Sequence, residues 1–167
     1  MKKYYFTILF SLLTLITSDV LAQTDTKEAN VKVSGEVTKP LMLSLADIQQ
    51  FKQNEVVRKE KDGKDHTYTG VILSDILKKA GVTLGKDLRG INLTKFVSVG
   101  ASDGYRVVFA LAELDKDFTD RAIILATKID SKPLPDGDGP FRIIVQDEKR
   151  PARCIKMVKW IKVQFGK

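Results

Sequence analysis

Short apolar runs separated by turn-forming residues most constrain how this chain can fold. Val31, Val33 and Val37 alternate with polar residues, which predicts a half-exposed strand that ends at Pro40. Further strand-like runs lie at residues 96–99, 106–109, 122–126, 141–145 and 155–165. Many short strands with few helical segments predict one α+β domain dominated by mixed β-sheets, with no internal repeat or linker.

Capping residues predict two short helices among these strands. Ser44 is followed three positions later by Asp47, which is an N-terminal capping pattern, so a helix should run to about Phe51. Ser74 caps a second helical segment, and this segment should end at Gly81 because glycine commonly stops a helix. The helices are expected to be minor elements beside the sheets.

Two loops carry strong turn signals. Residues 56–68 turn at Asp62-Gly63, which predicts a β-hairpin. Residues 133–140, which read Pro-Leu-Pro-Asp-Gly-Asp-Gly-Pro, predict a rigid loop. The Asp-Gly-Asp-Gly stretch hints at a cation site, but a third oxygen ligand and a distal Glu are missing from the spacing of a calcium-binding loop. A plain turn is therefore favoured.

The first 22 residues have the three parts of a secretory signal peptide. A basic start precedes an apolar run at residues 4–17, and the small residues Val20 and Ala22 precede the expected cleavage at Gln23. The apolar run is shorter than the ~20 residues of a membrane span, and no Arg-Arg pair marks the twin-arginine route. We therefore expect Sec-type export to the periplasm or the medium, with an uncleaved anchor as the alternative.

Cleavage would divide the chain into a signal peptide (residues 1–22), a flexible polar tail (residues 23–30) and a folded domain (residues 31–167). No stretch of that domain is apolar enough to span a membrane. The chain has a net charge of +7, but its basic residues are scattered among acidic ones, so nucleic acid is not an expected partner.

Reactive side chains are scarce, because the chain has one His and one Cys. His66 stands beside the hairpin turn, where a solvated strand residue is favoured over a catalytic base. Cys154 follows Arg153, whose charge could lower the pKa of the thiol, although a buried and inert thiol is favoured. One His and one Cys cannot form a disulfide or a four-ligand zinc site. We predict no catalytic residue and no metal ligand.

A cluster of basic residues occupies positions 149–156. With Arg142 it could form a pocket for phosphate or another anion. An exposed turn with ordinary surface lysines is equally compatible with the sequence, so both interpretations stay open.

Six short motifs follow one another along residues 31–165. They are residues 33–37 with 40–41 and 45–47, residues 68–77 with 80–82, Ser102-Asp103-Gly104-Tyr105, Pro133-Leu134-Pro135, Gly139-Pro140-Phe141-Arg142 and Ala152-Arg153-Cys154-Ile155-Lys156. In this order and spacing they resemble the sulfite-oxidase-type molybdopterin-binding domain. The resemblance implies an α+β fold of mixed β-sheets with a few short helices, whose cleft holds a pterin.

Two departures from that family concern the metal and the phosphate. Enzymes of the family carry a molybdenum-binding Cys before the Gly-Val-x-Leu motif, but Val56–Thr69 contains none and no other soft ligand replaces it. They also commonly have a His before the Gly-Pro motif, where this chain has Asp136-Gly137-Asp138, and an acid would repel a phosphate. Sec export of an unfolded chain would also preclude a preloaded cofactor.

The resemblance therefore implies an exported relative that has kept the fold and lost the metal, and a binding protein is favoured over an enzyme. Such a protein would hold a metal-free pterin and present it to a membrane signalling receptor. Two alternatives stay open. The first is a molybdopterin-dependent oxidoreductase with an unusual metal ligand, and the second is a partner-binding domain whose cleft is empty.

A pterin offers an amino group and a ring N–H side by side, which suit one carboxylate. Asp103, in an Asp-Gly turn, is the candidate carboxylate, with simple turn chemistry as the alternative. The residues expected to face a carbonyl or phosphate, carried over from matching motifs, are Arg142, Arg153 and Lys156. Tyr105 and Trp160 are candidates for stacking on the ring, although both are also compatible with the core.

Overall fold

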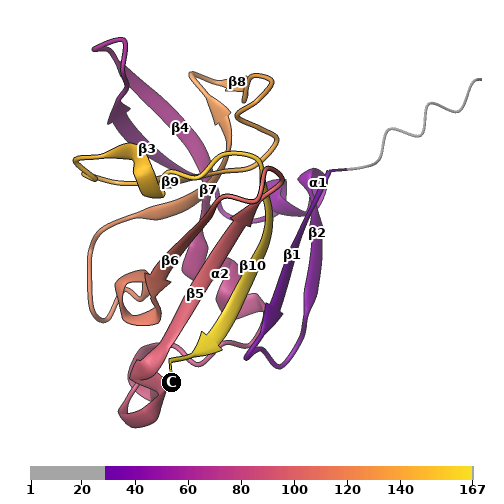
Figure 1. The fold of residues 1–167 in the computed structure, drawn as a ribbon, viewed down its shortest axis with the longest axis vertical. Coiled ribbons are helices and arrows are strands. Elements are labelled where there is room, and N and C mark those ends of the chain that lie inside the picture. Colours follow the sequence, from indigo (N-terminus) through magenta and orange to yellow (C-terminus); the bar gives the residue numbers. More distant parts are fainter. Residues whose placement is uncertain (1–28, 167) are drawn as a thin grey trace, which may run out of the picture.

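A computed structural model describes residues 29–166, which form two five-stranded β-sheets with short helices between the strands (Figure 1). The expected signal peptide (residues 1–22) and most of the expected tail lie outside the described residues. The predicted α+β class with mixed sheets and few short helices is confirmed.

The first sheet has the strand order β2-β1-β10-β5-β6. Its strands are β1 (Asn30–Gly35), β2 (Leu41–Ser44), β5 (Lys95–Ala101), β6 (Arg106–Ala110) and β10 (Val158–Phe165). β1 and β10 pair in parallel, and the other pairs of this sheet are antiparallel. The parallel pair joins the two ends of the described chain at the middle of the sheet (Figure 1).

The second sheet is antiparallel, with the order β3-β4-β7-β8 and with β9 also paired to β7. Its strands are β3 (Asn54–Lys59), β4 (Asp65–Ile72), β7 (Ile123–Ile129), β8 (Lys132–Pro133) and β9 (Arg142–Val145). β3 and β4 form the hairpin predicted from Asp62-Gly63, and Gly63 has the positive φ of +79° that this turn requires.

The helices are short, and the two predicted ones lie close to the predicted residues, although Ser74 lies inside the second helix and does not cap it. They are α1 (Leu45–Gln49), α2 (Leu73–Lys79) and the 3₁₀ turns η1 (Gly85–Asp87), η2 (Gly90–Thr94), η3 (Leu111–Leu114) and η4 (Pro151–Arg153). Ser44 and Asp47 form a reciprocal capping box at the start of α1. Within residues 29–166 no helix is long and apolar enough to cross a membrane.

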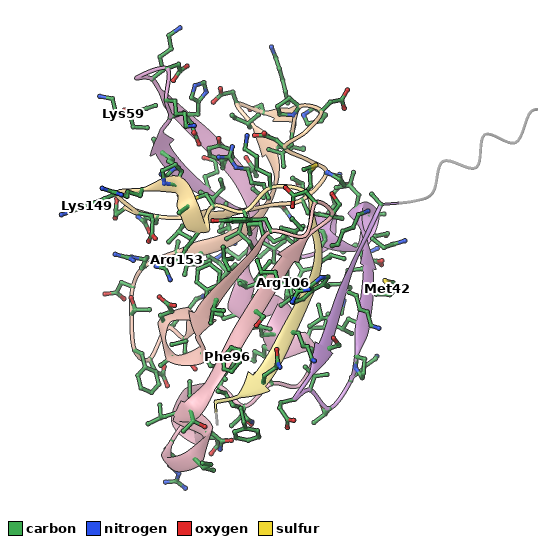
Figure 2. The ribbon with its side chains drawn as sticks, in the orientation of Figure 1. Met42, Lys59, Phe96, Arg106, Lys149 and Arg153 are labelled. Carbon is green, nitrogen blue, oxygen red and sulfur yellow. The ribbon has the colours of Figure 1, made fainter. Side chains whose placement is uncertain are left out.

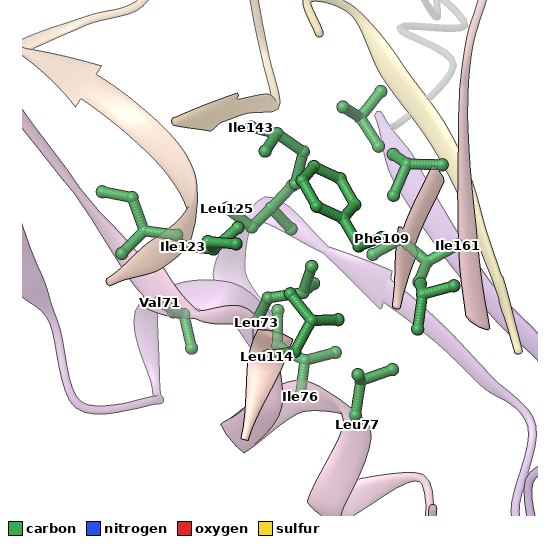
Figure 3. Packing of buried hydrophobic residues seen from close by; sticks show 14 of the residues in the cluster. Val71, Leu73, Ile76, Leu77, Phe109, Leu114, Ile123, Leu125, Ile143 and Ile161 are labelled. Carbon is green, nitrogen blue, oxygen red and sulfur yellow. The ribbon is translucent and has the colours of Figure 1, made fainter. Parts of the chain in front are cut away.

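The core lies between the two sheets and is closed on one side by α2 (Figure 3). Leu125 and Ile143 of the second sheet face Phe109 and Ile161 of the first, and all four are buried. One face of each sheet packs against this core. The polar side chains described below lie outside the core, at the end where loops of both sheets meet.

Candidate ligand-binding site

A cleft of about 540 Å³ opens where loops of the two sheets converge. Its walls come from the β3–β4 hairpin, the β5–β6 turn, the loop before β9 and the segment that follows η4. The polar residues that line it are Glu60, Lys61, Asp62, His66, Tyr68, Asp103, Tyr105, Asp138, Arg142 and Lys156. Four of the five predicted pterin-binding residues (Asp103, Tyr105, Arg142 and Lys156) are therefore brought together here.

Arg142, the first residue of β9, is buried beneath the floor of this cleft, with its side chain 5% exposed. Its Nη1 donates to the hydroxyl of Tyr68 at 2.7 Å and to Oδ2 of Asp138 at 2.8 Å. Its Nη2 donates to Oε1 of Glu60 at 3.1 Å. The guanidinium is thus held by two carboxylates and a phenol, which is the pairing that a buried charge requires.

Tyr68 is fully buried on β4 and connects this network to Glu60. Its hydroxyl donates to Oε1 of Glu60 at 2.7 Å while accepting from Arg142. Burial, together with the hydrogen bond to Glu60, raises the pKa of Tyr68 well above its ordinary value, so the phenol stays protonated.

Lys156 reaches the same network from the segment after η4. Its Nζ lies 2.5 Å from Oδ1 of Asp138, and its side chain is half-exposed. Asp138 therefore uses one carboxylate oxygen for Lys156 and the other for Arg142.

Asp103 and Tyr105 form the opposite rim, in the turn between β5 and β6. Oδ1 of Asp103 accepts the backbone N–H of Tyr105 at 2.9 Å, so the predicted turn chemistry is present and the second carboxylate oxygen remains an acceptor. The hydroxyl of Tyr105 donates to the carbonyl of Ala152 at 3.0 Å, and its side chain is half-exposed. A fixed aromatic ring and a carboxylate thus stand next to each other at the mouth of the cleft.

Arg153, the fifth predicted residue, does not line the cleft, and neither does Trp160, the second candidate for stacking. Arg153 donates through Nε and Nη2 to Glu148, at 2.8 and 2.9 Å, and through Nη1 to Glu113 at 3.1 Å. The hydrogen bonds from Arg153 hold the pKa of Glu148 below its usual value. Figure 2 shows Arg153 at the flank of the molecule, near the segment that carries Lys149. Trp160 covers Gly100 on the first sheet.

His66 lies at the hairpin end of the cleft between two carboxylates. Its Nδ1 lies 2.6 Å from Oδ2 of Asp130, and its Nε2 lies 3.0 Å from Oδ2 of Asp62. The hydrogen bond with Asp130, followed by that with Asp62, raises the pKa of His66 above its ordinary value. Both ring nitrogens are thereby occupied, so His66 positions the hairpin tip and is poorly placed to act as a free base.

Cys154 lines the cleft but is buried, with 4% of its surface exposed. Burial raises the pKa of the thiol, which opposes the lowering that neighbouring Arg153 was considered to cause. Instead, the charge of Arg153 is directed at Glu148 and Glu113. The favoured prediction of an inert thiol agrees with this geometry.

Glu60 and Tyr68 are central to the site, yet sequence reasoning assigned them no role. Tyr68 begins the motif at residues 68–77, and its place in a strand, where alternate side chains face inward, was the one signal of its role. Glu60 follows β3 as one charge among several on the hairpin, and nothing local distinguishes it from a solvated residue. Its role depends on Arg142, which lies 82 positions later in the chain.

Two sheets around one core, with a polar cleft at the loop end, define a sulfite-oxidase-like domain. Residues 18–165 match the family described as the oxidoreductase molybdopterin binding domain, and the chain belongs to that family. A pterin-type cofactor is what this class of domain binds.

A solved structure shows the same fold. The sulfane dehydrogenase SoxCD from Paracoccus pantotrophus superposes with a TM-score of 0.62 at 17% sequence identity. The match covers 81% of this chain and 38% of the SoxCD chain, so this chain spans well under half the length of its structural neighbour. Among curated proteins, none matches the chain significantly.

The donor set of the cleft suits a pterin ring better than molybdenum. The carboxylates and tyrosines match the flat ring and its N–H groups. Molybdenum in this family is held by a soft thiolate, whereas the thiol here is buried with a raised pKa. Within residues 29–166, no three His, Cys, Asp or Glu side chains are grouped so that they could hold a metal ion. The ring therefore suits this donor set, whereas residues 56–69 offer no thiolate for molybdenum.

Proposed function

We propose that this protein is an exported, non-enzymatic pterin-binding protein that holds a metal-free pterin in the cleft. One observation carries the proposal: carboxylate and aromatic side chains from both sheets converge on a cleft whose thiol is buried and protonated. Family membership supports the pterin, and the donor set supports the absence of the metal.

Asp103 and Tyr105 would make the principal contacts with the ring. The carboxylate of Asp103 accepts the adjacent amino and ring N–H groups, and the half-exposed ring of Tyr105 packs against the pterin face. The hydrogen bond from Tyr105 to the carbonyl of Ala152 fixes the phenol before the ligand arrives, which reduces the entropy lost on binding.

Export and presentation to a membrane receptor complete the proposal. The first 22 residues support Sec-type export, and cleavage before Gln23 would release the protein into the periplasm or the medium. Mass analysis of the exported protein should give an N-terminus at Gln23. Retention of residues 1–22 in a membrane fraction would contradict a freely diffusing protein.

Fluorescence quenching of a pterin on titration with the protein tests whether the protein binds this class of ligand. The wild-type protein should bind in the micromolar range, and Asp103→Asn should weaken binding by about 1.5–3 kcal/mol, the usual size of a charge-assisted contact. Asp136→Asn is the matched control, because Asp136 is exposed and does not line the cleft. Arg142→Ala should also weaken binding, but indirectly, because it leaves Glu60 and Asp138 without their shared cation, so circular dichroism must confirm folding.

Elemental analysis of protein purified from its own periplasm tests whether the bound pterin is metal-free. We expect far less than one molybdenum per chain. About one molybdenum per chain would favour a molybdopterin-dependent oxidoreductase with an unusual ligand. Failure of the wild-type protein to quench any pterin at high micromolar concentration would favour a partner-binding domain with an empty cleft.

A further inference from the structure

We infer that Asp138 makes the cleft select pterins that lack a phosphate. This inference rests on the proposed pterin-binding function and specifies the class of pterin. It concerns Lys156 and Arg142, the two cations of the cleft that form ion pairs with Asp138.

The carboxylate of Asp138 occupies both of these cations at once. Its Oδ1 lies 2.5 Å from Nζ of Lys156, and its Oδ2 accepts from Nη1 of Arg142 at 2.8 Å. A phosphate group binds to proteins through the same N–H donors of Lys and Arg. The positions that a ligand phosphate would take are therefore already filled by a side chain of the protein.

Two further N–H bonds of Arg142 are also paired within the protein. Nη2 donates to Glu60, and Nη1 is shared with the hydroxyl of Tyr68. Nε is buried without a partner and is not exposed to the cleft. Three of the five N–H bonds of Arg142 are therefore paired within the protein, and its side chain is only 5% exposed, so it offers little to an incoming anion.

Asp138 is also held firmly in this position. Its backbone N–H donates to the carbonyl of Pro135 at 3.0 Å, and its carbonyl accepts the N–H of Met157 at 2.9 Å. The loop before β9 is thus tied to the segment that carries Lys156. Because the carboxylate is 15% exposed and fixed at both sides, displacement by a phosphate would break two ion pairs and leave Asp138 facing a like charge.

The other charged residues of the cleft do not offset the repulsion between Asp138 and a phosphate. Within the described lining, Glu60, Asp62, Asp103 and Asp138 oppose Lys61, Arg142 and Lys156, with His66 held between Asp62 and Asp130. Lys61 stands on the hairpin turn, where its charge is exposed to solvent and screened. An uncharged ring with N–H donors is favoured by this balance, and a dianionic group is not.

The experiment compares two ligands that differ by one group, 6-hydroxymethylpterin and its phosphate monoester. Fluorescence titration of the wild-type protein should give at least about tenfold tighter binding of the alcohol, because like charges at close range cost several kcal/mol. Asp138→Asn keeps the shape of the side chain and removes its charge, so the preference should fall to about twofold or reverse. Asp136→Asn, in the same loop but outside the cleft, should keep the full preference.

A second variant guards against a folding defect in Asp138→Asn. Lys156→Gln exposes the charge of Asp138 without removing it, and Lys156 is half-exposed, so the variant should fold and should bind the ester still more weakly relative to the alcohol. Equal binding of the two ligands by the wild-type protein, or an unchanged preference in folded Asp138→Asn, would overturn the inference.

Inorganic phosphate separates this inference from the proposed function. Asp138→Asn should be stabilised against thermal unfolding by millimolar phosphate, whereas the wild-type protein should not, because only the variant offers Lys156 and Arg142 to an anion. If the wild-type protein bound neither pterin, the proposed function would fail. The phosphate comparison would then still decide whether Asp138 blocks an anion site, and stabilisation of the wild-type protein by phosphate would refute that.

Discussion

The guanidinium of Arg142 donates to the hydroxyl of Tyr68 at 2.7 Å, across 74 positions of sequence and between two strands that do not pair with each other. The same hydroxyl donates a hydrogen bond to Oε1 of Glu60. These two hydrogen bonds connect β4, β9 and the end of the β3–β4 hairpin beneath the cleft. Tyr68 and Arg142 are buried and the side chain of Glu60 is 19% exposed, so the floor of the site and the stability of the fold are coupled.

Tyr68→Phe should therefore destabilise the protein. The variant keeps the ring in the core but removes hydrogen bonds to two charged groups, and each such bond contributes about 1.5–3 kcal/mol. Because the ion pair between Arg142 and Glu60 remains in the variant, we expect the total loss of unfolding free energy to lie near the lower end of that range. Urea unfolding followed by circular dichroism measures it. Tyr105→Phe is the matched control, and it should cost less than about 0.5 kcal/mol because Tyr105 is half-exposed.

His66 should titrate above its ordinary pKa of about 6.5. It is the only His of the chain, so its Cε1 proton gives one unambiguous resonance in an NMR pH titration. Asp130→Asn should lower the measured pKa, because Asp130 provides the main hydrogen bond and Asn tolerates the positive φ of +48° at that position. Asp65→Asn removes a neighbouring exposed charge and should change the pKa little. Equal shifts in the two variants would contradict the pairing.

The same histidine should make stability depend on pH. A group whose pKa is raised on folding stabilises the folded state fully below its unfolded pKa, and this contribution is lost as pH rises through the folded pKa. The difference in unfolding free energy between the wild-type protein and His66→Gln should accordingly be largest near pH 5.5 and shrink at alkaline pH. A difference that grows with pH would contradict the assignment of a charged His66 between Asp62 and Asp130.

Cys154 should react slowly with thiol reagents in the folded protein. Its thiol is buried and its pKa is raised, so little thiolate is present or accessible at pH 8. We expect alkylation about a hundredfold slower than in guanidinium-unfolded protein, since reaction requires local opening. As the chain has a single Cys, mass analysis reports this site alone. Comparable rates in the folded and unfolded states would show that the thiol is exposed.

Gly100→Ala should disturb the indole of Trp160. A Cβ at position 100 would overlap the Trp160 ring, and overpacking of this kind costs about 1–3 kcal/mol. Trp160 is the only Trp, so a shift in its emission spectrum reports the disturbance directly. Ser98→Ala, on the same strand, is the control that should leave the spectrum unchanged.

Local patterns predicted most of the elements but not all of their ends. The Ser44–Asp47 cap placed α1 correctly, yet β2 was missed because Leu41–Ser44 offers only four residues before that cap. The predicted strand at residues 155–165 begins later, at Val158, since the positive φ of Met157 interrupts the extended chain. Pairing of β1 with β10 joins segments at opposite ends of the domain, and no local pattern encodes it.

The site was predictable where a motif fixed the residue and its loop. Asp103, Tyr105, Arg142 and Lys156 were predicted from motifs and line one cleft. Arg153 shares a motif with Lys156, but the 3₁₀ turn at Pro151–Arg153 directs it to Glu113 and Glu148 instead. Which charges meet across the cleft depends on tertiary contacts that sequence spacing does not contain.

The position of β10 also affects the order in which the molecule can form. This last strand of the described chain is the middle strand of the first sheet, with β1 on one side and β5 on the other. Until residues 158–165 have left the ribosome, β1–β2 and β5–β6 are two hairpins with no strand between them, so neither can complete the sheet. The first sheet of a nascent chain built this way therefore stays incomplete until residues 158–165 are available to pair.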